Sequence, residues 1–328
     1  MTYKRTIGID VGKSTLDVTV LGAEGVLLKT QVDNNAKNIK AFFKKVEIDA
    51  DTLVCMEHTG IYNQPLLTFM SEVGGNVWVV NAIHLKRSLG LVRGKSDKID
   101  SERIARFAWV HQANAVLWKP AREVIQKLKQ LVSLRSRLIK AKKAIEAPLA
   151  EVRRFYKEHH KTLVNASKAS IKALLRDLKE IDQQIKELIK NDEQLNKQFE
   201  IITSVPSIGS VIGVAVLIGT NEFKDINDPR KFACHCGLAP FEHSSGTSIR
   251  GKTRVSPMAN KELKSLFHLA ALSSIRNRGT MKAYFERKVL EGKNKMLVLN
   301  AIRNKLVHRI FACVRDQKKY IDNSMVLS

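Results

Sequence analysis

Two acidic residues stand where predicted strands end. Asp10 lies in the apolar segment Ile7-Gly8-Ile9-Asp10-Val11, and Glu57 directly follows Leu53-Val54-Cys55-Met56. A single acid at the end of a strand is usually a turn or capping residue. Two carboxylates at the ends of buried strands can also reach a hard cation above the edge of a sheet. We therefore treat Asp10 and Glu57 as candidate metal ligands.

A second pair of acids opens a predicted helix. Asp97 and Asp100 are three residues apart, which places both carboxylates on one face of the helix, one turn apart. Stabilisation of the helix dipole explains one such acid, but two fit a cation site better. Four carboxylates could hold two Mg²⁺ or Mn²⁺ ions and thereby support in-line phosphoryl displacement. Basic side chains would bind the phosphates of the substrate; the candidates are Lys13, Lys95, Lys98, Arg103, Arg250, Lys252 and Arg254.

The elements that must position these acids belong to an α/β domain, which we predict over residues 1–118. Alternating residues over 6–11, 15–21 and 26–32 predict a three-stranded antiparallel meander. Helices at 38–46 and 63–73 then alternate with strands at 52–56 and 77–81, and a helix follows over 97–111 with Ser96 as its N-cap.

Two further regions follow Pro120. Apolar residues at three- and four-residue steps predict a long antiparallel helical pair over 119–200, which could be a coiled-coil spacer, a dimerisation element or a DNA contact. Residues 201–328 predict a mostly α domain that begins with two short helices and turns at Gly209, Gly213 and Gly219. In Pro206-Ser207-Ile208-Gly209, a positive φ at Ser207 would be strained, which makes phosphate binding by this turn doubtful.

The charge balance points to a polyanionic partner. Lys and Arg total 56 against 32 Asp and Glu, a net charge of +24, and residues 250–319 alone carry 18 basic against 4 acidic side chains. Nucleic acid is the partner that best matches such an excess. The four cysteines form no zinc-site pattern, and we expect them to be reduced and mostly buried. Without a signal peptide or membrane span, the sequence predicts a cytoplasmic, nucleoid-associated protein.

Several motifs resemble those of the DEDD transposases of bacterial insertion sequences, a family that includes the Piv invertase. They are Gly8-Ile9-Asp10-Val11-Gly12-Lys13, Met56-Glu57-His58-Thr59-Gly60, Lys95-Ser96-Asp97-Lys98-Ile99-Asp100-Ser101, Val205-Pro206-Ser207-Ile208-Gly209, Cys236-Gly237-Leu238-Ala239-Pro240 and His243-Ser244-Ser245-Gly246. The resemblance covers the whole chain. It implies a ribonuclease H-like (RuvC-like) N-terminal domain, a helical linker and a C-terminal transposase domain.

The resemblance also implies site residues and partners. Asp10, Glu57, Asp97 and Asp100 would be the metal-binding tetrad, and a serine of the second domain would form a covalent bond to DNA. We prefer Ser245 as this nucleophile, with Ser244 as the alternative. A structured noncoding RNA, the bridge RNA of this kind of element, would choose the DNA sites by base pairing. Because two duplexes must be handled together, we expect a homodimer or homotetramer.

Two other readings stay open. A RuvC-like junction nuclease would use the same four acids for hydrolysis and would need neither serine. A noncatalytic protein that binds element ends would use the acids only as helix caps, and its DNA binding would survive the removal of divalent metal.

Overall fold

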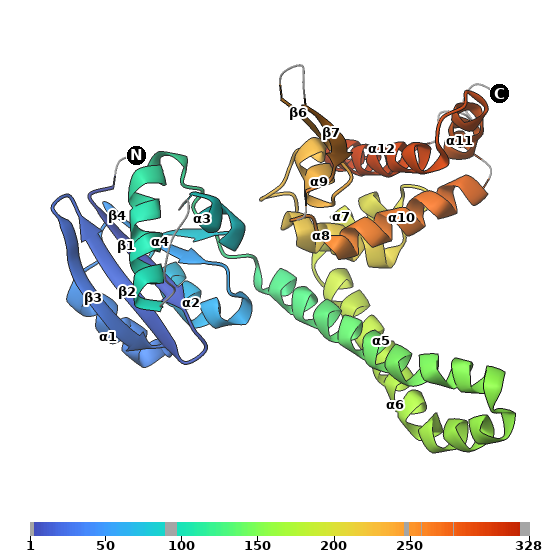
Figure 1. Cartoon of the computed structure of the whole chain (residues 1–328), viewed down its shortest axis with the longest axis horizontal. Coiled ribbons are helices and arrows are strands. Elements are labelled where there is room, and N and C mark those ends of the chain that lie inside the picture. Colours follow the sequence, from blue (N-terminus) through green and yellow to red (C-terminus); the bar gives the residue numbers. More distant parts are fainter. Residues whose placement is uncertain (1–2, 89–96, 246–248, 257, 278, 322–328) are drawn as a thin grey trace. The chain divides into compact units, whose positions relative to one another are not determined.

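The computed structural model describes residues 3–88, 97–245, 249–256, 258–277 and 279–321; the side chains of 86–87, 97–99, 241–245 and 249–254 are outside that description. The chain forms two compact units, residues 1–120 and 121–328. Figure 1 shows the elements of each. Within the described residues, no helix is long and apolar enough to cross a membrane.

A five-stranded mixed sheet forms the centre of the N-terminal unit. Its strands are β1 (Arg5–Val11), β2 (Thr15–Gly22), β3 (Gly25–Asp33), β4 (Thr52–Glu57) and β5 (Asn76–Val80), in the order β3-β2-β1-β4-β5. The first three strands pair antiparallel, whereas β4 is parallel to β1 and β5 is parallel to β4. This order and these directions are those of a ribonuclease H-like domain, so the predicted fold class is confirmed.

Helices cover both faces of this sheet, as side-chain alternation along the strands requires. One face packs on α1 (Ala36–Val46) and α2 (Gln64–Glu72), which follows the short 3-10 helix η1 (Gly60–Asn63). The opposite face packs on α4 (Asp97–His111), which supplies Ile104, Phe107 and Ala108 to a small core. Two short elements flank α4, namely α3 (Ala82–Ser88) and the 3-10 helix η2 (Gln112–Asn114). The helix α3 was not predicted.

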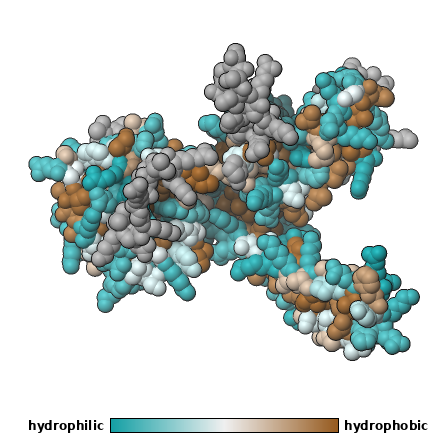
Figure 2. Space-filling view, in the orientation of Figure 1, coloured by the Kyte–Doolittle hydropathy of each residue, from teal (hydrophilic) through white to brown (hydrophobic). Residues whose placement is uncertain are grey.

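An antiparallel helical pair opens the C-terminal unit. The helices are α5 (Glu123–Phe155) and α6 (Lys157–Lys190), and they run side by side as an arm (Figure 1). None of residues 129–180 is buried, and polar and apolar side chains are mixed over the arm's surface (Figure 2). At its base, Ile125, Leu128 and Ile185 join the core of the C-terminal helices.

The remaining elements form a helical body with one hairpin. They are α7 (Glu193–Thr203), α8 (Ser210–Thr220), α9 (Pro229–His235), the strands β6 (Phe241–Ser245) and β7 (Ile249–Arg254), α10 (Lys261–Arg276), α11 (Thr280–Leu290) and α12 (Lys295–Arg315). The hairpin was not predicted. All four cysteines are free, and Cys55 and Cys236 are buried. The predicted three-way division at 118 and 200 stays a prediction.

The prediction of turns at Gly213 and Gly219 was wrong. Both glycines lie inside α8, where they allow close helix packing. A Cβ at Gly213 would lie 2.9 Å from the Thr203 side chain, and one at Gly219 would lie 3.3 Å from Leu263. Gly209 does stand at the turn, as the N-cap of α8. Ser207 has a φ of 68°, so the left-handed conformation that the sequence argument considered is adopted here by a serine.

Candidate active site

The strand β1 directs Asp10 toward the face of the sheet that α4 covers. Thr6, Gly8 and Asp10 share this face because successive side chains alternate. Thr6 Oγ1 donates a hydrogen bond to the Ala105 carbonyl of α4 at 3.0 Å, which fixes the orientation of the strand. Asp10 is half-buried at the carboxyl end of β1.

Glu57 occupies the matching position on the neighbouring parallel strand. Ile9 of β1 pairs with Met56 of β4, so Asp10 and Glu57 each follow this last pair by one residue. Leu53 and Cys55 pack against α4, and alternation therefore places Glu57 on the same face as Asp10. The two predicted strand-end acids are thus side by side at one edge of the sheet.

Gly8 allows α4 to lie directly on the sheet. A Cβ at this position would lie 2.2 Å from the Ala105 nitrogen and 2.3 Å from the Ser101 carbonyl oxygen. Ser101 also forms a buried hydrogen bond of 2.9 Å with Thr19 of β2. Since Ala105 lies over Thr6 and Ser101 lies over Gly8, α4 runs antiparallel to β1, and its N-terminal turn lies at the sheet edge that carries Asp10.

That N-terminal turn brings in the second pair of acids. Asp97 is the first residue of α4 and Asp100 lies one turn further; the side chain of Asp97 lies outside the described residues. Burial and the neighbouring negative charge of Asp100 raise the pKa of Glu57 above its usual value. The carboxylates of Glu57 and Asp100 therefore face a common space, although they come from different elements.

Basic side chains contact two acids of α4. Arg103 contacts the Asp100 carboxylate at 2.8 Å. Glu102, by contrast, points away to Lys29 and Arg106, whose hydrogen bonds lower its pKa. Asp100 thus lies near another carboxylate, whereas Glu102 of the same helix is paired with two cations. Glu57 lies beside a like charge, which contributes to its raised pKa.

Hard oxygen donors of this kind suit Mg²⁺ or Mn²⁺. Among the side chains that the structure describes, no three acidic, histidine or cysteine residues are close enough together to hold a metal. That set does not include Asp97, one of the four predicted ligands. Asp10, Glu57 and Asp100 fit such a site by donor type, but the structure does not bring these three described carboxylates together as a group.

Two asparagines near these acids were missed by the sequence analysis. Asn63 is buried, donates to the Glu57 carbonyl at 2.8 Å and accepts from both the backbone nitrogen and the hydroxyl of Thr59 at 2.7 Å. Asn34 donates to the carbonyls of Gly12 and Tyr62, at 2.9 Å each. They hold the loops that follow Asp10 and Glu57, and no local sequence signal marks them because their partners are distant backbone groups.

A fifth acid, Asp17, was also missed. It is buried on β2 directly opposite Asp10, and its carboxylate accepts hydrogen bonds from Gln31 at 3.2 Å. Its position between the apolar residues Leu16 and Val18 is the signal that could have placed it on the α4 face. The Gln31 side chain thus holds Asp17 in place on β2.

The serine candidates lie in the other unit. Ser244 and Ser245 belong to β6, where they pair with Arg250 and Ile249 of β7. Arg250, Lys252 and Arg254 all lie on β7, and the side chains of both strands are outside the described residues. Of the other predicted basic contacts, Lys13 is exposed and Arg103 is half-buried; Lys95 and the side chain of Lys98 lie outside the description.

Comparisons with known proteins agree with this geometry. Residues 7–152 match a DEDD family model described as a transposase, and residues 199–286 match the transposase IS116/IS110/IS902 family. The chain is 26% identical to the pilin gene-inverting protein of Moraxella bovis, over 97% of this chain and 98% of that protein. It is 27% identical to a protein of insertion element IS116 from Streptomyces clavuligerus, over 45% of this chain and 36% of that protein.

A solved structure, the RuvC of T. thermophilus in complex with a Holliday junction substrate, aligns with a TM-score of 0.29 and 15% identity, over 35% of this chain and all of that one. The assignment of the fold rests on strand order rather than on this alignment. The two family models together span more than half of the chain and include both the acid motifs and the C-terminal unit. The chain therefore belongs to the IS110-type family of DEDD transposases, enzymes that cut and rejoin DNA.

Proposed function

We propose that this transposase cuts and rejoins element-end and target DNA by divalent-metal-dependent phosphoryl transfer through a serine. The observation that carries the metal part is the meeting of Asp10 and Glu57 at one sheet edge, with Asp100 close enough to raise the pKa of Glu57. Asp10, Glu57, Asp97 and Asp100 would hold Mg²⁺ or Mn²⁺. The bound metal would supply Lewis-acid stabilisation of charge on the phosphate oxygens.

The protein's own residues prepare this site. The lack of a side chain at Gly8 lets α4 pack directly on the sheet. Asn63 donates a hydrogen bond that holds the main chain at Glu57. Arg103 keeps the Asp100 carboxylate in place. Such positioning is how a fold lowers the cost of gathering like charges before a ligand arrives.

Ser245, or Ser244 as the alternative, would attack the DNA phosphorus. The serine oxygen would form a new phosphoester bond while the bond to one DNA oxygen breaks, and the serine proton would end on the departing DNA hydroxyl. A later attack by a DNA hydroxyl would reverse these steps and rejoin the strands. The strand β7, with Arg250, Lys252 and Arg254, offers positive charge beside these serines.

The choice of DNA sites would fall to a noncoding RNA, and the working form would be a homodimer or homotetramer. Two features support these parts of the proposal. The net charge of +24 suits a large polyanionic partner. The long, half-buried seam of the α5/α6 arm suits a helical partner.

The test combines purified protein, Mg²⁺, RNA transcribed from the flanking element DNA, and labelled junction and target DNA. We expect an SDS-resistant protein–DNA adduct with the wild type. Asp10→Asn and one of Ser244→Ala or Ser245→Ala should abolish it, whereas Glu102→Gln, a matched change on α4, should retain it. Metal-dependent nicking without an adduct would instead favour the hydrolytic junction nuclease.

A further inference from the structure

A buried arginine in the C-terminal unit lacks an anionic partner. Arg303 lies in the middle of α12 and is 6% exposed. Its Nε is buried and has no hydrogen-bond partner. Within the described side chains, no carboxylate forms an ion pair with it. An uncompensated buried charge costs several kcal/mol, so its retention here calls for a reason.

Its hydrogen-bond partner among the described side chains is a histidine. An Arg303 guanidinium nitrogen lies 2.6 Å from Nδ1 of His268 on α10. Because the guanidinium has no acceptor atoms, it donates and the histidine accepts. Burial and the charge of Arg303 lower the pKa of His268, which keeps the imidazole neutral at neutral pH. The ring proton is then on Nε2, where it can be donated to an anion.

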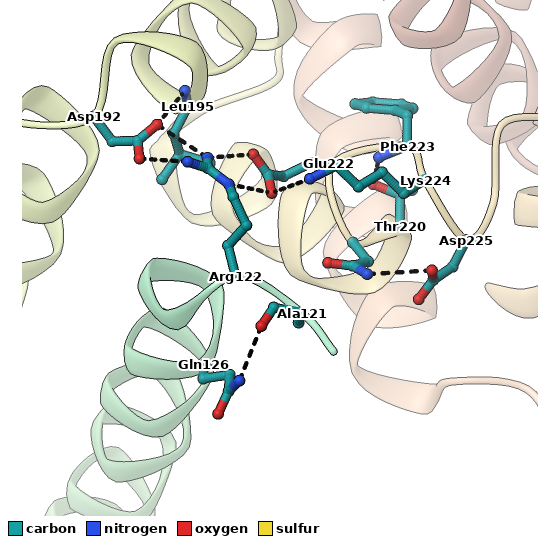
Figure 3. Close-up of polar contacts among 11 residues, drawn as sticks. Ala121, Arg122, Gln126, Asp192, Leu195, Thr220, Glu222, Phe223, Lys224 and Asp225 are labelled. Carbon is teal, nitrogen blue, oxygen red and sulfur yellow. Dashed lines mark hydrogen bonds and ion pairs between the residues drawn. The ribbon is translucent and has the colours of Figure 1, made fainter. Parts of the chain in front are cut away.

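The charge of another arginine in the same unit is neutralised by ion pairs. Arg122, at the N-terminus of α5, contacts Asp192 at 2.7 Å and Glu222 at 2.5 Å (Figure 3). Two carboxylates thus neutralise a guanidinium that is only partly buried. Arg303 is more deeply buried, and among the described side chains its hydrogen-bond partner is the imidazole of His268.

The site lies beside the start of the β6–β7 hairpin. Asn300 and Asn304, on the same helix as Arg303, both donate to the Leu238 carbonyl, at 2.8 and 3.1 Å. Leu238 is three residues before β6. An anion held by Arg303 would therefore lie on the helix that contacts the segment leading into β6.

We propose that Arg303 and His268 form a binding site for a phosphate group of a nucleic-acid backbone, beside the start of the β6–β7 hairpin. Guanidinium and imidazole N–H groups together offer the charge-assisted donors that phosphate oxygens require. The phosphate would supply the counter-charge that Arg303 lacks. This inference rests on the transposase's binding of nucleic acid and not on the serine step, so a failed adduct assay would leave it standing.

The test compares Arg303→Met with Lys305→Met in the full-length protein. Both changes remove one positive charge from α12, but Lys305 is exposed and lies over the ring of Tyr284. Binding to a short DNA duplex and to the RNA transcribed from the flanking element DNA is measured over a range of salt concentrations. Thermal unfolding of the free protein is measured in parallel.

We expect Arg303→Met to weaken binding about tenfold and to lower the salt slope by about one, more than Lys305→Met does. A loss with DNA alone identifies a DNA phosphate, and a loss with RNA alone identifies an RNA phosphate. The melting temperature should hold or rise, because an unpaired buried charge has gone. Binding equal to that of Lys305→Met, or a melting temperature several degrees lower, would overturn the proposal.

Inorganic phosphate provides an independent readout. If it binds beside His268, it should raise the pKa of that imidazole in an NMR titration of the wild type and leave it unchanged in Arg303→Met. An unshifted His268 in the wild type, at phosphate concentrations that compete with DNA, would count against the site.

Discussion

Carboxylates gather in two places in this transposase, and the two clusters have opposite surroundings. At the sheet edge of the N-terminal unit, burial and Asp100 raise the pKa of Glu57. At the base of the α5/α6 arm, Arg122 joins Asp192 and Glu222, and the pKa of each acid is lowered (Figure 3). The second cluster is complete without a ligand. In the first, two like charges lie near each other, and we propose it as the metal site.

The backbone around each cluster matches this difference. Glu222 is held in a left-handed turn in which Asn221, Glu222 and Phe223 all have positive φ. The ion pairs with Arg122 offset the strain of this conformation. They connect the starts of α5 and α7 with the end of α8. Around Glu57, by contrast, Asn63 and Asn34 donate hydrogen bonds to backbone carbonyls.

Among the proposed changes, Glu57→Gln is expected to have the largest effect on activity. Removing a ligand of a metal-dependent centre should lower strand cleavage by about 10³-fold or more. The melting temperature should be unchanged or higher, because a like charge has been removed from beside Asp100. A fall in stability that matches the loss of activity would show that Glu57 is structural.

Arg122→Met tests the completed cluster. It leaves the fully buried Glu222 without its main partner, so the free energy of unfolding should fall by about 3 kcal/mol. Chemical denaturation measures this change. Lys127→Met, which removes an exposed partner of Glu123 from the same helix, should cost under about 0.5 kcal/mol. Equal effects of the two changes would remove the contrast between the clusters.

Asn63→Ala should have an intermediate effect, confined to the loop that follows β4. It removes hydrogen bonds to Glu57 and Thr59 and should cost about 1–3 kcal/mol. Thermal unfolding measures the stability change, and cleavage rates at saturating metal separate it from catalysis. An unchanged cleavage rate together with lowered stability would show that the loop tolerates movement.

A pH titration should give the smallest effect, with opposite signs in the two clusters. Glu57, whose folded pKa is raised, contributes stability that is present at low pH and lost as the pH rises through that pKa. Asp192 and Glu222, whose pKa values are lowered, contribute stability above their ordinary values of 3.8 and 4.5 that is lost as the pH falls. Denaturation of Glu57→Gln and Arg122→Met between about pH 2 and 7 separates the contributions. If the stabilities of the two variants changed with pH in the same direction, the opposite pKa shifts of the two clusters would be contradicted.

Much of the N-terminal unit could be predicted from the sequence, because local alternation and helical spacing determine it. The strands that bear Asp10 and Glu57 and the helix that begins at Asp97 appear where they were expected. The contacts that assemble the site could not be predicted in this way. The packing of α4 on Gly8 brings together segments that are distant in sequence. The hydrogen bonds of Asn63 involve backbone groups.

The C-terminal unit was less accessible to sequence analysis for a related reason. Gly213 and Gly219 suggested turns, but their missing side chains serve helix packing instead. The hairpin of β6 and β7 has a polar, basic sequence without the apolar alternation that marks a half-buried strand. Arg303 appeared as one basic residue among many, since only the folded structure reveals that it is buried.

The most direct test of the metal-site proposal is a calorimetric titration of Mn²⁺ into the full-length protein, with wild type, Asp10→Asn and Glu102→Gln compared at pH 7. The account predicts that Mn²⁺ binds to the wild type and to Glu102→Gln and that this binding is lost in Asp10→Asn. Unchanged Mn²⁺ binding by Asp10→Asn would contradict the central claim that the carboxylates at this sheet edge form the metal site.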